Sequence, residues 1–227
     1  MLNLSKIKYK MNHIFYLLKK EFQLEYKNIY SLFGNVLFLV ATIYLCNLIF
    51  GEINNSLVWN SLYWIIVLFT SIQFTTRSFL NESQINLILY YTLTKPEYII
   101  FSKTIYNQIV IIVLSLFAYL FYCLLLGNMV ENIGLFVIAI ICGSSIFSAI
   151  LSTMSAIAIN TNNPPTLITI LSIPLLIPAL LAITQLSHAA IINLPLVKIW
   201  PLVVLLLTLN FMNLVMGYIL FPYLWRE

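Results

Sequence analysis

The sequence predicts an all-α, polytopic membrane protein with six transmembrane helices, and three observations support this prediction. Hydrophobic residues make up 62% of the 227 residues, charged residues only 8%, and the mean hydropathy is +0.99, all outside the range of soluble domains. Six runs without Lys, Arg, Asp or Glu reach the roughly 20 apolar residues that a helix needs to cross a bilayer. These runs cover residues 30–50, 57–76, 104–126, 133–159, 166–186 and 199–222. They are too long for barrel strands and lack the alternation of such strands.

The basic residues gather on one side of the predicted membrane. An even number of spans places both termini on the same side, and ten of the 11 Lys and Arg residues fall there. The ten are Lys6, Lys8, Lys10, Lys19, Lys20, Lys27, Arg77, Lys95, Lys103 and Arg226. Only Lys198 falls on the other side. Because cytoplasmic loops are enriched in basic residues, we expect both termini and residues 77–103 in the cytoplasm. This topology accounts for the net charge of +4, so the charge does not indicate nucleic acid binding.

The segment between the second and third runs, residues 77–103, carries more charged residues than any other segment between two long apolar runs. Its charged residues are Arg77, Glu82, Lys95, Glu97 and Lys103. Residues 82–93 predict a short cytoplasmic helix that ends near Pro96, because proline disfavours helix in the residue before it. A short, partly apolar helix exposed between two spans is typical of a docking element for a partner. We therefore expect a coupling helix here.

Residues 12–28 predict an amphipathic helix that lies in the cytoplasmic interface of the membrane. The apolar face carries Phe15, Leu18, Phe22 and Tyr26, and the polar face carries Lys19, Lys20, Gln23 and Lys27. The alternative is a soluble helix packed on a partner protein. On either interpretation, residues 1–28 form a basic cytoplasmic segment, and residues 29–227 form a six-helix permease domain.

Aromatic residues gather near the start of the second run, at Trp59, Tyr63 and Trp64. Two interpretations are open for them. Cofactor binding is one, but an aromatic belt at the membrane interface is the commoner cause of such a cluster. We therefore expect these three side chains at the outer interface.

Two further patterns lie inside the later runs. The fourth run carries small residues four apart, at Ser144, Ser148, Ser152 and Ala156, and such residues let helix backbones approach closely. This packing face lies either inside the bundle or against a second copy, so a homodimer is one option. The fifth run contains Pro174 and Pro178, which predict a kinked or broken helix that serves as a hinge.

Several kinds of catalytic chemistry have no sequence motif here. The chain has no G-x-x-x-x-G-K-[ST] phosphate loop, no paired carboxylates and no His/Cys cluster that would bind a metal. Cys46, Cys123 and Cys142 lie within the runs and show no C-x-x-C spacing, so we interpret them as buried thiols. We expect a non-catalytic protein that a separate subunit drives. The composition is that of the membrane half of an ATP-binding-cassette system.

Five stretches resemble the CcmB family, the heme exporter protein B or permease subunit of the cytochrome c maturation system. They are KKEFQLE at 19–25, SFLNES at 78–83, LYYTLTKPEYIIFSKTIYN at 89–107, TLITILSIPLLIP at 166–178 and the terminal FPYLWRE. The third and fourth stretches are the most specific, and the resemblance extends over almost the whole chain.

The resemblance implies the six-helix arrangement of ABC-2-type exporters in a bacterial inner membrane, with a separate cytoplasmic ATPase (CcmA-like). It also implies a heme-handling membrane protein (CcmC-like), a small membrane protein (CcmD-like) and a heme chaperone (CcmE-like). Heme is handled by this complex, and none is expected to bind this chain directly. The ATPase would drive heme export or release of the heme-loaded chaperone.

Carried over by residue, Glu82, Pro96 and Lys103 match the ATPase-contacting segment of the family, and Pro174 and Pro178 match its broken fifth helix. The full set of candidate docking residues is Glu82, Leu89, Tyr90, Tyr91, Pro96 and Lys103. The chain departs from many members at Ser83 and Asn86, where a glycine and a second acid are common. The contact with the ATPase is therefore expected to be less electrostatic here. The alternatives are a generic ABC-2-type exporter of a glycan, lipid or drug, and a structural membrane anchor for the ATPase.

Overall fold

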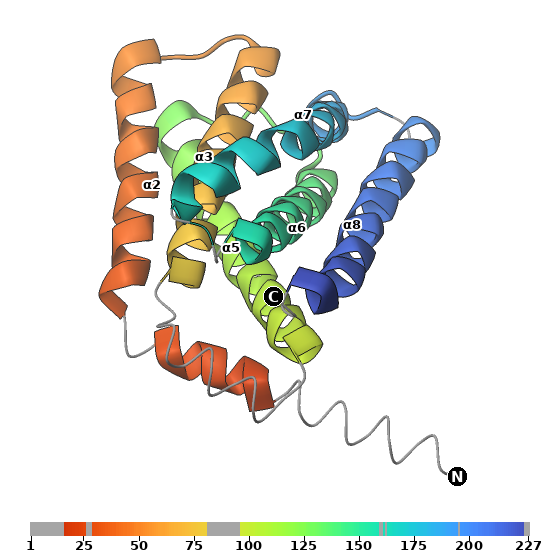
Figure 1. Ribbon diagram of the computed structural model, residues 1–227. Helices are drawn as coiled ribbons and strands as arrows, with labels where there is room; N and C mark the ends of the chain where they lie inside the picture. Colours follow the sequence, from red (N-terminus) through yellow and green to blue (C-terminus); the bar gives the residue numbers. More distant parts are fainter. Residues whose placement is uncertain are drawn as a thin grey trace.

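Six long helices carry the chain back and forth between the two ends of a bundle (Figure 1). The computed structural model describes residues 16–25, 29–80, 96–158, 161, 163–194 and 196–224. The helices are α2 (Ile29–Phe50), α3 (Ser56–Leu80), α5 (Pro96–Leu126), α6 (Ile133–Ala158), α7 (Pro164–Ile191) and α8 (Leu196–Leu224). A short helix at residues 16–25 precedes them, and the described chain contains no strand. The predicted all-α fold is confirmed.

Each long helix contains an apolar stretch of 19 to 28 residues that can cross a membrane, which confirms the six predicted spans of a multi-pass membrane protein. Some helices extend beyond their apolar run. The third helix begins at Pro96, before the predicted start of its run at Thr104, and the fifth continues to Ile191. His188 therefore lies in the last turn of α7, beyond the predicted end of the fifth run at residue 186. Each of the three cysteines is a free, partly buried thiol.

The two ends of the bundle differ in their connections. We call one the basic end: it holds the helix of residues 16–25, the carboxyl end of α3 with Arg77, the beginning of α5 with Lys103, and the short turn between α6 and α7. The opposite, distal end holds the connections at residues 51–55, 127–132 and 192–195. In Figure 1 the helix of residues 16–25 lies across the basic end, close to the beginning of α2.

Helix α6 lies at the centre of the bundle and contacts α3, α5, α7 and α8. The predicted face of small residues is buried among these helices: Ser144, Ser148 and Ser152 have no exposed surface. The small-residue face therefore packs inside the bundle, not against a second copy. A Cβ added to Gly143 would lie 2.5 Å from the Trp64 ring and 2.9 Å from Ile183, so only glycine lets α3 and α7 approach α6 this closely.

The aromatic cluster of α3 lies in the core, and the prediction of an interfacial belt is wrong. Trp59, Tyr63 and Trp64 are 0%, 1% and 0% exposed. Trp59 packs edge-on against Tyr122, with ring centroids 4.9 Å apart, and Tyr63 packs against Phe136 at 5.6 Å. Because α6 and the end of α5 cover this face of α3, the rings contribute buried area instead of contacting lipid headgroups.

Helix α7 continues through both of its internal prolines, so of the two predicted options the broken helix is wrong, and a kink stays a prediction. Pro174 and Pro178 lie on the exposed side of α7, together with Ile177 and Leu181. The opposite side is buried, and α7 packs closely on α6. Each proline removes one N–H from the helix, and packing along the other face holds the helical path. The two proline rings therefore do not pack against the other described helices.

Candidate functional site at the basic end

Three elements meet at the basic end: the helix of residues 16–25, the end of α3 and the beginning of α5. The Phe22 ring packs edge-on against Tyr106 of α5, with centroids 4.9 Å apart and planes at 86°. Leu18 packs against a buried cluster that includes Phe74 and Tyr106. The short helix is therefore held against the transmembrane bundle itself, in addition to any contact with the membrane surface.

The buried face of this helix is rotated from the predicted one. Glu21 is 6% exposed, whereas Phe22 remains 46% exposed despite its contact with Tyr106. Lys19 and Gln23 are exposed, as predicted, and Lys20 is half-buried, with its Nζ 3.2 Å from Oε1 of Glu21. The face toward α5 therefore carries carboxylates as well as apolar groups. Phe15, Tyr26 and Lys27 lie outside the described residues.

The buried ammonium group of Lys103 lies close enough to the short helix to act on its Glu25 carboxylate. Its side chain is 2% exposed, and its Nζ lies 4.7 Å from the centroid of the Phe79 ring, a geometry in which a cation is attracted to the ring face. Burial raises the pKa of the Glu25 carboxyl, the positive charge of Lys103 opposes that rise, and Glu21 adds to it. The ammonium group thus acts electrostatically on the short helix while it packs on α3.

Lys103 was predicted to contact the ATPase, but its side chain is buried within this chain and cannot reach a partner from that position. Pro96 is the first residue of α5, and the docking helix predicted before it lies outside the described residues. Four other docking candidates, Glu82, Leu89, Tyr90 and Tyr91, lie outside the described residues. Their role remains a prediction.

A hydrogen-bonded residue in α5 joins three helices just inside the basic end. The Ser78 hydroxyl of α3 donates to Oδ1 of Asn107 at 3.0 Å, and Nδ2 of Asn107 donates to Oγ of Ser152 in α6 at 3.1 Å. All three side chains are buried. Our sequence analysis missed Asn107, although an amide within a long apolar run is a signal, since such residues hydrogen-bond across helices in membranes.

Arg77 passes close to α2 at the same end. A Cβ added to Gly34 would lie 3.2 Å from a guanidinium nitrogen of Arg77, so the glycine makes room for this side chain. Among the described residues, no group of three His, Cys, Asp or Glu side chains could hold a metal ion. At the basic end, the charged side chains Lys103 and Arg77 thus lie between helices and contact the neighbouring helix.

A protein-family model described as CcmB protein matches residues 12–222, which include the helix of residues 16–25 and nearly all of the bundle. The chain belongs to the CcmB family. CcmB proteins are the membrane permease subunits of an ABC system of heme export and cytochrome c maturation, so the chain is the membrane component of such a complex. A comparison with curated proteins finds none that matches significantly.

Proposed function

We propose that this CcmB-family chain couples ATP hydrolysis by a separate cytoplasmic ATPase (CcmA-like) to heme export or to release of a heme-loaded chaperone (CcmE-like). A heme-handling membrane protein (CcmC-like) and a small membrane protein (CcmD-like) complete the proposed complex. Heme is the substrate of this complex, and the nucleotide site lies in the ATPase.

The observation that carries this proposal is the way in which the end of α3 and the beginning of α5, on either side of residues 81–95, are held in the bundle. Just before this segment, Ser78 is hydrogen-bonded through Asn107 to α6. Just after it, α5 carries Lys103, which is buried against Phe79 of α3. A displacement of residues 81–95 is therefore passed directly to α3, α5 and α6. In this account Lys103 holds the beginning of α5 against α3. The residues that contact the ATPase are Glu82, Leu89, Tyr90 and Tyr91.

The proposed orientation places the basic end in the cytoplasm, where the ATPase can reach it. Lys19, Lys20, Arg77 and Lys103 all lie at this end, and basic residues are enriched on the cytoplasmic side of membrane proteins. Both termini are then cytoplasmic, in a bacterial inner membrane.

We expect Glu82→Lys to reduce ATPase association while the protein still inserts into the membrane. A hydrogen bond to a charged group contributes about 1.5–3 kcal/mol, so the affinity should fall about ten-fold or more. The measurement is the amount of ATPase that co-purifies with the tagged permease after co-expression of the four membrane and ATPase subunits.

Glu131→Lys is the matched control, since Glu131 is an exposed acid at the distal end. This variant should retain the ATPase at the wild-type level. Unchanged ATPase recovery with Glu82→Lys would contradict the docking assignment. Co-elution of the CcmC-like subunit tests the heme assignment separately, because a generic exporter of glycan, lipid or drug would purify without it.

A further inference from the structure

Polar side chains inside the bundle differ between the two ends, and the distal group is fully paired. Nε1 of Trp64 donates to Oγ of Ser187 at 2.7 Å, and Ser187 in turn donates to Oδ1 of Asn60 at 2.7 Å. Nδ2 of Asn60 donates to the Thr184 carbonyl at 2.9 Å. The hydroxyl of Tyr122 donates to the carbonyl of Trp59 at 2.9 Å. In the distal half, these buried polar groups are therefore hydrogen-bonded directly to one another within the chain, with no need for water.

Toward the basic end, several buried hydroxyls have no such partner. Thr75, Ser148 and Ser155 are 0% exposed, and their oxygens have no hydrogen-bond partner among the described residues. Buried Ser and Thr residues elsewhere in the bundle, such as Thr70 and Ser71, donate to the carbonyl four residues earlier in their own helix. The unpaired hydroxyls thus depart from what helices in this same bundle do.

The unpaired groups form one continuous strip with the Asn107 junction. Thr75 lies one turn from Ser78 on α3. Ser148 and Ser155 lie one turn to either side of Ser152 on α6. Asn107 bonds to both Ser78 and Ser152. We call these six residues the polar seam: Thr75, Ser78, Asn107, Ser148, Ser152 and Ser155.

The chemistry of the polar seam indicates its ligand. The seam contains only hydroxyl and amide groups and no charge, so it offers its ligand neutral hydrogen-bond donors and acceptors. In a membrane-spanning bundle, unpaired polar groups are costly and are tolerated where they line a hydrated cavity. Buried water makes about three hydrogen bonds to groups of this kind. Water both donates and accepts, and it is small enough to reach hydroxyls between closely packed helices.

We propose that the polar seam is a water-binding site that fills from the basic end, while the distal half remains sealed. Water at these hydroxyls replaces the hydrogen bonds that Asn107 loses when α6 moves against α3 and α5. The seam is therefore the part of the interior where the helices separate most readily. This proposal rests on the described helices and does not require that the partner is a heme-system ATPase.

The test measures access of D₂O to single thiols. Cys46, Cys123 and Cys142 are first replaced by alanine, and then Ser148→Cys or Ser155→Cys is introduced into the purified full chain in lipid nanodiscs. Infrared spectroscopy follows the exchange of S–H to S–D. We expect both seam thiols to exchange at least ten-fold faster than two control thiols, with S155C the faster because it lies nearer the basic end.

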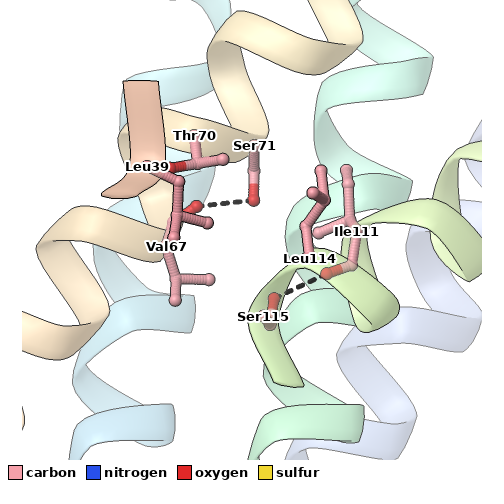
Figure 2. Close-up of a pocket in the computed structure, with 7 residues that line it drawn as sticks. All are labelled: Leu39, Val67, Thr70, Ser71, Ile111, Leu114 and Ser115. Carbon is pink, nitrogen blue, oxygen red and sulfur yellow. Dashed lines mark hydrogen bonds between the residues drawn. The ribbon is translucent and has the colours of Figure 1, made fainter. Parts of the chain in front are cut away.

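The controls are Ser71→Cys and Ser115→Cys, which line a narrow gap between α2, α3 and α5 (Figure 2). This gap is too narrow to admit a water molecule. Its two serines are 1% and 2% exposed and donate to Val67 and Ile111 of their own helices. Helices α3 and α6 both begin at the distal end, and Ser71 lies as many residues into α3 as Ser148 lies into α6. The two positions are therefore matched in their depth within the bundle.

Equal exchange rates for seam and control thiols, whether fast or slow, would overturn the proposal. Fast exchange of S155C with S148C as slow as the controls would also overturn it, because the seam would not be continuous. A variant that loses the wild-type circular dichroism or elutes as an aggregate is replaced by Ser152→Cys, whose thiol occupies the middle of the same strip. Loss of ATPase binding in separate experiments leaves these outcomes unaffected.

Discussion

Lys103→Glu is expected to release the helix of residues 16–25 from the bundle. The substitution removes the ammonium group beside Phe79 and places a third carboxylate near Glu21 and Glu25. The substitution turns the attraction between Lys103 and the partly exposed Glu25 into a repulsion, a change of about 1–2 kcal/mol. Amide exchange within residues 16–25 should therefore become about ten-fold faster or more. Hydrogen-exchange mass spectrometry of the purified protein measures this directly, and ATP-dependent activity of the complex should be lost with it.

Two further variants separate this effect from a general loss of positive charge. Lys19→Glu makes the same change of charge, but at an exposed position on the helix of residues 16–25 itself. Amide exchange should stay within about two-fold of wild type, because exposed charges contribute only about 0–1 kcal/mol. The charge swap Glu25→Lys with Lys103→Glu should restore part of the lost protection. If exchange in Lys103→Glu matches Lys19→Glu, the helix is not held by Lys103.

Replacing Pro174 and Pro178 together by alanine is expected to uncouple ATP hydrolysis from release of the heme-loaded chaperone. The two prolines lie four residues apart on the exposed side of α7, and each removes a backbone hydrogen bond. Alanine restores these bonds and straightens the helix, so thermal stability should be preserved or raised. If the prolines form a hinge, chaperone release per ATP should fall about 5-fold or more, given typical coupling free energies of about 1–3 kcal/mol.

Pro201→Ala is the control for this double variant, because Pro201 is an exposed proline in α8. It should leave chaperone release per ATP at the wild-type ratio. The alternative is that the prolines of α7 set only a fixed kink for packing. A wild-type ratio in the double variant would support that alternative and rule out the hinge.

The fold follows from the sequence because six uncharged runs can be satisfied only as membrane-spanning helices. The exact helix limits do not follow. Hydropathy places the beginning of the third run at Thr104, but α5 already begins at Pro96, because polar and charged residues continue the helix before the apolar run. The burial of Trp59 and Trp64 could not be predicted either. A tryptophan near the end of a span satisfies its N–H at the interface or in the core, and only the position of α6 decides between them.

The candidate site was only partly predictable. The family resemblance pointed to residues 82–103, but it did not indicate that Lys103 is buried. In the short helix, Phe22 and Glu21 are neighbours in sequence, so two registers of the amphipathic pattern differ by about 100° and compete. The apolar pattern favours Phe22 as the buried residue, whereas the structure buries Glu21. The charge of Lys103 acts on Glu25 of the same short helix, and only the fold brings this distant part of the sequence close to the helix.

The most direct test of the coupling role is a photo-crosslinking measurement from residues 81–95 to the ATPase. A photoreactive phenylalanine derivative replaces Tyr90 or Tyr91 in the assembled complex, and the same group at Glu52, an exposed position at the distal end, serves as the control. The account predicts a permease–ATPase adduct from Tyr90 or Tyr91 and none from Glu52. The absence of an adduct from both tyrosines, or an equal yield from Glu52, would contradict it.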